Sequence, residues 1–157
     1  MLNLLGPRPY SDRIVDAIYA GELWEHLERD AASRLTRECL RVLKPGGVLR
    51  ICVPDGEAFW REYLRKLDEQ LARPPLEREA CSLDDHVRMY FRDICTRRRL
   101  LGSMGHFHKW QYDEVQLTAL FSDSGFREVR RHAFHDSRIP DIEQVERSDF
   151  LIVEGVR

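Results

Sequence analysis

Alternating apolar and amphipathic stretches along the chain predict an α/β fold. Residues 14–20, which begin at Ile14 and end at Ala20 (IVDAIYA), are rich in β-branched and aromatic side chains and predict a buried strand. Apolar residues then recur every four positions over 23–43, which predicts one continuous helical face. The Pro45-Gly46-Gly47 turn is expected to end this helix, and residues 48–53 to form a second buried strand. A strand, a helix and a strand in this order form a βαβ unit with parallel strands.

The remaining pattern adds three helices and two strands. The helices are predicted over 58–72, 83–101 and 113–124, the first ending at an Arg-Pro-Pro break and the last at Gly125. The strands are predicted over 126–134 and 150–156, joined by a polar loop. Asp30 is a candidate cap for a fresh helix start within 23–43. Four strands and four helices, parallel at the start and hairpin-like at the end, indicate an open α/β sheet with helices on its faces.

Composition fits a single domain over residues 1–157. The apolar fraction is 43%, and 25 basic against 27 acidic residues leave a net charge of −2, which argues against nucleic-acid binding driven by bulk charge. No apolar run approaches a membrane span, and the first residues lack a signal-peptide pattern. The four cysteines, widely spaced, predict buried reduced thiols and a cytoplasmic protein: Cys39, Cys52, Cys81 and Cys95.

Three motifs carry a resemblance to a known family. The stretches VDAIYAGELWEHL, LTRECLRVLKPGGVLRICVPD and HKWQYDEVQLTALFSDSGF resemble the second half of class I methyltransferases that use S-adenosylmethionine. The likeness is greatest to a small bacterial group with "LEHL", "RVLKPGG", "VPD" and an H-(K/R)-W-x-Y-(D/E) loop. FREVRRHAF and SDFLIVEGVR resemble its last two strands. The resemblance implies a Rossmann-like sheet in the order 3-2-1-4-5-7-6, of which this chain supplies strands 4 to 7.

The same resemblance implies a sequence that is truncated at its N-terminus relative to the family. The glycine-rich cofactor loop and the acidic residue of strand 2 have no counterpart before Ile14. The strand over 14–20 is then expected to expose an edge that carries no lysine or proline. We therefore expect a homodimer, or a partner protein, to cover the strand from Ile14 to Ala20.

Candidate site residues follow the first two strands, because ligands of open α/β sheets bind beyond the carboxyl ends of the strands. Gly21 and Glu22 would form a turn facing the cofactor or substrate, although Glu22 replaces the histidine or asparagine expected by resemblance. Glu25 and His26 match the family's "EH" and are candidate catalytic residues. The alternative is that Glu25 caps a helix and His26 packs under the sheet. Asp55, after the second strand, is a candidate substrate contact.

A second group of candidates lies in the loop before the helix at 113–124. By resemblance this loop covers the substrate, with His108 as a general base or orienting group and Trp110 and Tyr112 as substrate contacts. An imidazole with a pKa of about 6.5 suits proton transfer at neutral pH. The alternative is a structural loop that Trp110 anchors in the core. A metal site could be assembled from four histidines, but we interpret them as placed by chance and predict no metal: His106, His108, His132 and His135.

Three functions remain open at this level. The first is S-adenosylmethionine-dependent methyl transfer to a sugar or other small-molecule hydroxyl or amine. The second is a binding or scaffold protein that kept the fold without the cofactor and acts as a dimer or partner subunit. The third is a different enzyme that uses the remaining cleft around Glu22, Glu25, His26, Asp55 and His108. Fold alone does not decide among them.

Overall fold

A four-stranded sheet organises the chain. The computed structural model describes residues 10–79, 83, 85, 88 and 108–157. The strands are β1 (Val15–Gly21), β2 (Leu43–Val53), β3 (Arg127–Arg131) and β4 (Leu151–Val156), in the spatial order β1-β2-β4-β3. β1 and β2 are parallel, and β4 is antiparallel to both of its neighbours. This order confirms the predicted arrangement 4-5-7-6.

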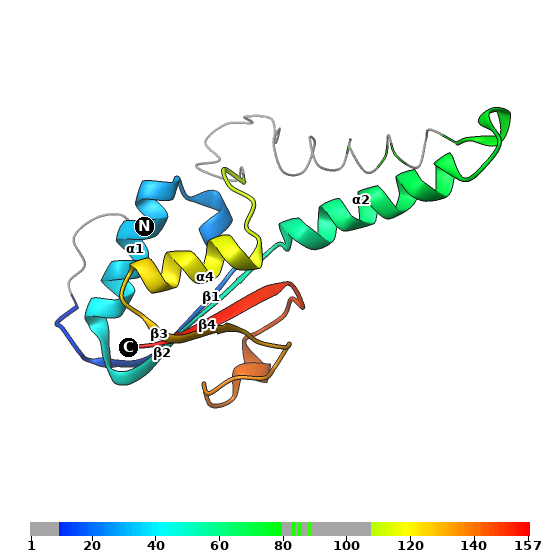
Figure 1. Cartoon of the computed structure of the whole chain (residues 1–157). Helices are drawn as coiled ribbons and strands as arrows, with labels where there is room; N and C mark the ends of the chain where they lie inside the picture. Colours follow the sequence, from blue (N-terminus) through cyan, green and yellow to red (C-terminus); the bar gives the residue numbers. More distant parts are fainter. Residues whose placement is uncertain (1–9, 80–82, 84, 86–87, 89–107) are drawn as a thin grey trace, which may run out of the picture.

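Two helices cover one face of the sheet. Figure 1 shows α1 (Arg29–Val42) and α4 (Glu114–Asp123) on the same side, and they contact each other as well as the strands. Alternate residues of β2 and β4 point into this layer, as the period of two along a strand requires. The core between helices and sheet includes Leu35, Leu117 and Phe121, packed with Ile51 and Val153.

The opposite face of the sheet carries a buried charged network. Arg50, in the middle of β2, has a fully buried side chain and donates two hydrogen bonds of 2.7 Å to the Glu146 carboxylate. It also donates to Glu154 of β4 at 2.9 Å. The backbone N–H of His135 donates to Glu146 at 2.7 Å, so the connection between β3 and β4, which includes η4 (Ile142–Gln144), is fastened to the sheet. The apolar pattern of β2 gave no sign of this network.

The helix predicted over 23–43 is interrupted. A short 3₁₀ turn, η1 (Trp24–His26), comes first, and Leu27 is then extended with φ −98° and ψ 144°. α1 starts at Arg29 after Glu28, so Asp30 lies in its first turn and does not cap it. The four-residue period continues through the break because Leu27 and α1 bury their apolar side chains in the same core.

The Pro45-Gly46-Gly47 turn lies inside β2 and does not end α1. The helix already ends at Val42, and Leu43 pairs with Val15. The next pair is Ala17 with Val48, so the turn forms a bulge that absorbs the extra residues of β2. Gly46 has φ +80°, a left-handed conformation that glycine adopts without steric cost.

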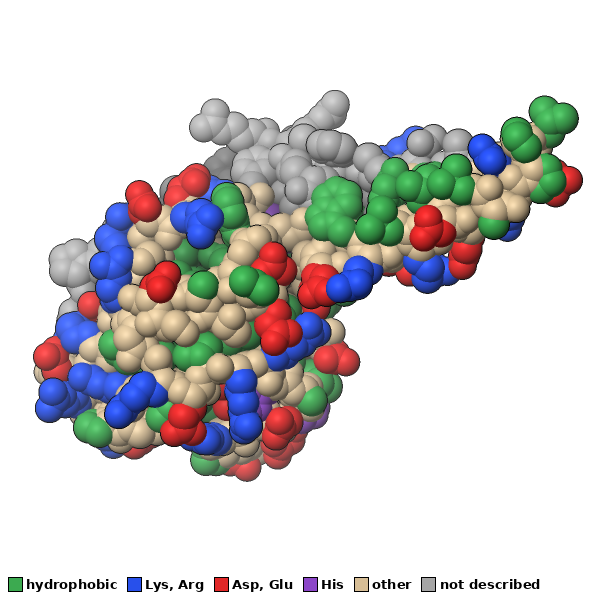
Figure 2. Space-filling model, in the orientation of Figure 1, with side chains coloured by type: hydrophobic (Ala, Val, Ile, Leu, Met, Phe, Trp, Pro, Cys, Tyr) green, Lys and Arg blue, Asp and Glu red, His purple; other side chains and the backbone are tan. Residues whose placement is uncertain are grey.

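The predicted later helices and strands are largely present. α2 (Gly56–Leu71) ends before the Arg-Pro-Pro break and η2 (Pro75–Glu77), and it projects away from the sheet (Figure 1). Figure 2 shows hydrophobic side chains along α2, and the exposed residues of this helix include Trp60, Leu64 and Leu71. β3 ends at Arg131 and is therefore shorter than the strand predicted over 126–134. Gly125, with φ +100°, follows α4 as expected.

Several sequence predictions fall on other parts of the chain. Cys39 and Cys52 are buried thiols, which confirms that prediction for these two residues. Most of the helix predicted over 83–101 lies outside the described residues, as do Cys81, Cys95 and His106. Within the described part of the chain, no helix combines the length and the apolar character that crossing a bilayer requires.

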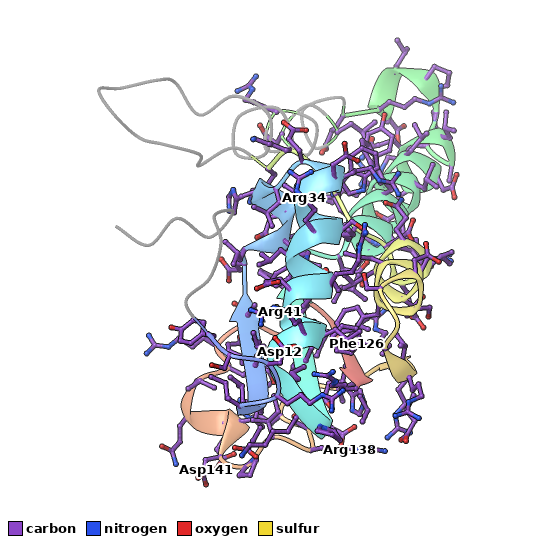
Figure 3. The ribbon with its side chains drawn as sticks, turned by 90° about the vertical axis from the view of Figure 1, so that its left-hand side faces the viewer. Asp12, Arg34, Arg41, Phe126, Arg138 and Asp141 are labelled. Carbon is purple, nitrogen blue, oxygen red and sulfur yellow. The ribbon has the colours of Figure 1, made fainter. Side chains whose placement is uncertain are left out.

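Ion pairs fasten the segment before β1 to the rest of the domain. Arg41, near the end of α1, pairs with Asp12 and donates to the backbone carbonyl of Tyr10 at 2.9 Å. Figure 3 shows Arg41 and Asp12 side by side. The backbone N–H of Ile14 donates to the carbonyl of Val42 at 2.9 Å, which extends the pairing towards β1. These contacts hold the start of β1 in place. The carboxyl end of the same strand leads into the candidate site.

Candidate functional site

The carboxyl end of β1 turns sharply into the candidate site. Glu22, directly after Gly21, has φ 54°, and its backbone N–H donates to the carbonyl of Cys52 in β2 at 2.8 Å. Ser148 donates to the Glu22 carboxylate at 2.6 Å. A Cβ on Gly21 would lie 2.6 Å from the Tyr19 hydroxyl, so a side chain at this position requires the Tyr19 side chain to shift. The predicted cofactor-facing turn therefore lies at the edge where ligands of such sheets bind.

Packing against α1 buries Trp24, the first residue of η1, shortly after this turn. The Trp24 indole is 1% exposed and donates to Thr36 of α1 at 3.0 Å. Thr36 in turn donates to the carbonyl of Ala32 at 2.8 Å. η1 is thereby anchored to the helix, and Glu25 is also only 1% exposed. The sequence thus places an acidic side chain in the interior, immediately beyond a strand end.

Glu25 has an unusual environment for a buried carboxylate. Neither of its side-chain oxygens has a hydrogen-bond partner among the described residues. Burial raises the pKa of Glu25 to about 7, with a further contribution from the negative charge of Glu22, while the backbone N–H of Glu25 itself opposes the shift. An unpaired buried carboxylate is costly, and such groups concentrate at functional sites.

Two histidines lie against Glu25. The Nε2 atoms of His26 and His108 lie 3.8 Å and 4.0 Å from Oε1 of Glu25. Both distances exceed that of a hydrogen bond. The two imidazole rings pack edge to face with their centroids 4.7 Å apart. We call Glu25, His26 and His108 the Glu25 cluster.

Backbone hydrogen bonds bring His108 to this position. The N–H groups of Lys109 and Trp110 both donate to the carbonyl of Glu25, at 2.7 Å and 3.1 Å. The side chains of His26 and His108 are 23% and 22% exposed, against 2% for Glu25. The two imidazoles are therefore the more accessible members of the cluster. Of the predicted catalytic residues, all three are brought together here.

The predicted substrate contact Asp55 has structural partners. Its carboxylate accepts a hydrogen bond from the backbone N–H of Ala58 at 3.0 Å and so caps α2. Its other oxygen accepts from Arg131 at 3.0 Å. The backbone also forms a parallel bridge with Tyr112. Asp55 thus ties the starts of α2 and of the segment before α4 together, and its role towards a substrate stays a prediction.

The aromatic residues of the loop are also held by neighbours. Trp110 donates its indole N–H to Gln116 at 2.6 Å, and the Arg29 guanidinium lies 4.6 Å from the centroid of its ring. Tyr112 is 4% exposed, and burial raises its pKa to about 12. These contacts favour an anchoring role for both residues. Their contact with a substrate likewise stays a prediction.

A cleft opens at the carboxyl end of β2, close to the Glu25 cluster. Its volume is about 450 Å³, and it is lined by Pro54, Asp55, Ala58, Phe59, Gln111, Arg131, Asp149 and Phe150. Gln111 follows His108 by three residues, so their Cα atoms are at most roughly 11 Å apart. The residues that line this cleft do not include those of the Glu25 cluster. Sequence reasoning missed Gln111, at the variable position of the H-(K/R)-W-x-Y motif, and Arg131, in the strand FREVRRHAF, because only the fold brings them to the cleft.

Comparisons with known proteins agree with this arrangement. The model of a methyltransferase domain family matches residues 5–51, which is less than half of the chain. No curated protein matches the sequence significantly. Among solved structures, the S-adenosylmethionine-dependent methyltransferase SibL in its apo form has a TM-score of 0.53 at 13% identity, with 99% of this chain and 34% of that chain covered.

Two further solved structures are similar. A SAM-dependent methyltransferase from Archaeoglobus fulgidus has a TM-score of 0.51 at 15% identity, covering 94% of this chain and 62% of that one. An O-methyltransferase family protein from Burkholderia thailandensis has a TM-score of 0.50 at 13% identity, covering 99% and 34%. This chain therefore spans between 34% and 62% of the length of these proteins.

The fold is that of the Rossmann-like class I methyltransferases, as the sequence motifs predicted. The family model that matches residues 5–51 describes a methyltransferase domain, and the similar solved structures are of methyltransferases. At these identities the structural likeness concerns the fold alone, and the substrate is not defined by it.

Proposed function

We propose that the chain acts in S-adenosylmethionine-dependent methyl transfer, with the Glu25 cluster and the adjoining cleft as the acceptor side of the site. The observation that carries this proposal is the meeting of a buried carboxylate and two imidazoles at the carboxyl end of β1. On a methyltransferase fold, this edge is where a ligand binds beside the strand ends. Glu25, His26 and His108 are the proposed catalytic residues.

The cleft supports a small-molecule acceptor. Its volume of about 450 Å³ lies within the range of small-ligand sites. Phe59 and Phe150 supply apolar walls, and the paired Asp55 and Arg131 supply polar groups at the same opening. We propose a sugar or another small molecule with a hydroxyl or amine as the acceptor, bound with that group towards His108.

The cofactor is proposed to approach Gly21 and Glu22. The family's glycine-rich loop follows strand 1, whereas the four described strands correspond to strands 4 to 7 of this fold. We therefore propose that the nucleotide part of the cofactor is bound by a segment outside the described residues or by another chain. The methyl group would then be presented across the turn at Gly21, next to the Glu25 cluster.

Calorimetric titration with S-adenosylmethionine tests this proposal. We expect saturable binding by the full chain, and competition by S-adenosylhomocysteine, the product left after transfer. The variant G21V is expected to weaken binding, because the added side chain shifts Tyr19 and adds bulk to the turn that is proposed to face the cofactor. The variant G46N serves as a matched control, since Gly46 has open space around it and lies in the bulge of β2. No binding by the folded wild-type chain would reject the proposal.

A binding or scaffold function is the second candidate, and it rests on β1. This strand lies at the edge of the described sheet, and within that part of the chain its only strand partner is β2. The other side of β1 offers backbone N–H and C=O groups to an added strand. A second copy of the chain, or a partner protein, would satisfy these groups. A folded chain that binds no S-adenosylmethionine but associates through β1 would favour this function.

A further inference from the structure

We propose that Glu25, His26 and His108 bind one divalent transition-metal ion, with Zn²⁺ as the probe. This proposal deepens the proposed function. Only the catalytic use of the ion rests on that function. Binding itself depends on the three side chains and not on methyl transfer. Each side chain offers one ligand atom, and these atoms all lie within 4.8 Å of one another.

The separations are close to those of a metal site. Ligand atoms bound tetrahedrally to Zn²⁺ at about 2.0–2.1 Å are roughly 3.3 Å apart. The Nε2–Oε1 distances of 3.8 Å and 4.0 Å need to shorten by about half an ångström, and since all three ligand atoms lie within 4.8 Å of one another, no pair needs to close by more than about 1.5 Å. The η1 turn that carries Glu25 is anchored to α1 and the two imidazoles are partly exposed, so the proposal assigns this adjustment to His26 and His108.

The environment of Glu25 favours a cation as its partner. The carboxylate is buried, and its oxygens lack hydrogen bonds from any described residue. A buried carboxyl without hydrogen bonds either stays protonated or, when it ionises, gains from a positive charge placed beside it. Two imidazoles beside it supply nitrogen ligands, and mixed nitrogen and oxygen ligands suit Zn²⁺, Mn²⁺, Fe²⁺ or Co²⁺. Mg²⁺ and Ca²⁺ favour sites made of oxygen atoms and fit this cluster poorly.

The number of ligands indicates what the ion would do. Three protein ligands leave a coordination position vacant, which is the arrangement of catalytic zinc sites. The two imidazoles are the partly exposed members of the cluster, at 23% and 22% against 2% for Glu25, so the vacant position is proposed to lie on their side. An acceptor hydroxyl bound there would be polarised by the ion, which is how a metal activates an oxygen nucleophile.

The site also joins two distant parts of the chain. Glu25 and His26 belong to η1, and His108 belongs to the segment bound to the Glu25 carbonyl through Lys109 and Trp110. An ion held by both parts binds the folded state only, so it raises the midpoint of thermal unfolding. This effect gives a readout that is independent of any enzyme activity.

The test is calorimetric titration of the tag-free, chelator-treated full chain with ZnCl₂, accompanied by the visible absorption spectrum of the Co²⁺ form. We expect one equivalent of Zn²⁺ per chain, a Co²⁺ spectrum typical of low coordination number, and a raised unfolding temperature. E25Q and H108N should each weaken Zn²⁺ binding by more than about tenfold. E28Q is the matched control, because Glu28 is an exposed carboxylate paired with Lys109 and lies outside the cluster.

The outcomes separate this proposal from the proposed function. No Zn²⁺ binding by the folded wild-type chain, or equal binding by E25Q and H108N, would overturn the metal site. Circular dichroism verifies that each variant is folded, and H26N provides a third ligand variant should E25Q fail to fold. Zn²⁺ binding without S-adenosylmethionine binding would keep the metal site and reject methyl transfer. Methyl transfer that is unaffected by a chelator, in a chain that binds no Zn²⁺, would keep the proposed function and reject the metal site.

Discussion

At the scale of single residues, Arg50 is the centre of a buried ion-pair network that joins β2 to β4 and to the segment between β3 and β4. Its side chain is fully buried and neutralises Glu146 and Glu154, which are themselves buried. In the variant R50M, both carboxylates lose their charged partner, and breaking a buried pair in this way costs about 3–5 kcal/mol. Urea unfolding should show this loss. The matched control R61M removes only an exposed pair with Glu57 and should cost less than about 1 kcal/mol.

The same network predicts how stability depends on pH. Burial by itself would raise the pKa of Glu146, but hydrogen bonds from Arg50 and from the His135 backbone outweigh it and hold the pKa below its usual 4.5. A carboxyl with a lowered pKa contributes stability above its unfolded pKa and loses it as pH falls through the folded value. The wild type should therefore lose stability below about pH 4.5. E146Q should show a shallower loss in unfolding experiments across this range, and equal slopes would contradict the assignment.

The candidate site could be predicted residue by residue but not as a cluster. The "EH" match indicated Glu25 and His26, and the H-(K/R)-W-x-Y loop indicated His108. Their contact depends on two backbone hydrogen bonds to the Glu25 carbonyl. Backbone hydrogen bonds of this kind cannot be predicted from the order of side chains in the sequence. The burial of Glu25 follows from the packing of Trp24 against Thr36, which is also a tertiary contact.

At the scale of elements, the sequence was most informative where an element has its own end signals. Asp113 accepts a hydrogen bond from the Gln116 backbone and caps α4, and Gly125 follows it, so this helix was predicted within one or two residues. The helix predicted over 23–43 was wrong in its first part, because apolar spacing does not record backbone angles. Leu27 is buried, so it fits the four-residue spacing of apolar residues although its backbone is extended and not helical.

The bulge in β2 gives a prediction at this scale. Gly46 has φ +80° and open space where a Cβ would lie, so only the backbone conformation opposes a side chain there. G46A should cost about 1 kcal/mol, because alanine is strained in the left-handed region. G46N should cost less, since asparagine tolerates this region better than alanine. Thermal unfolding of the two variants tests the order, and equal or reversed effects would show that the bulge adopts another conformation.

At the scale of the whole molecule, the strand order was predictable and the covering of its edge was not. The family motifs implied the order 4-5-7-6, and the sheet has it. The expectation that a second copy or a partner covers β1 stays a prediction. If a second copy covers this edge, light scattering at increasing concentration should give the mass of a dimer. A monomer at all concentrations would contradict the homodimer.

The central claim is that the Glu25 cluster is the working centre of a methyl-transfer site. Transfer of a labelled methyl group from S-adenosylmethionine to a mixture of small sugars, alcohols and amines tests it most directly. The account predicts transfer by the wild type and by E28Q, and a loss of at least about tenfold in E25Q and H108N. Transfer by folded E25Q and H108N at the wild-type rate, or no transfer by the folded wild-type chain, would contradict it.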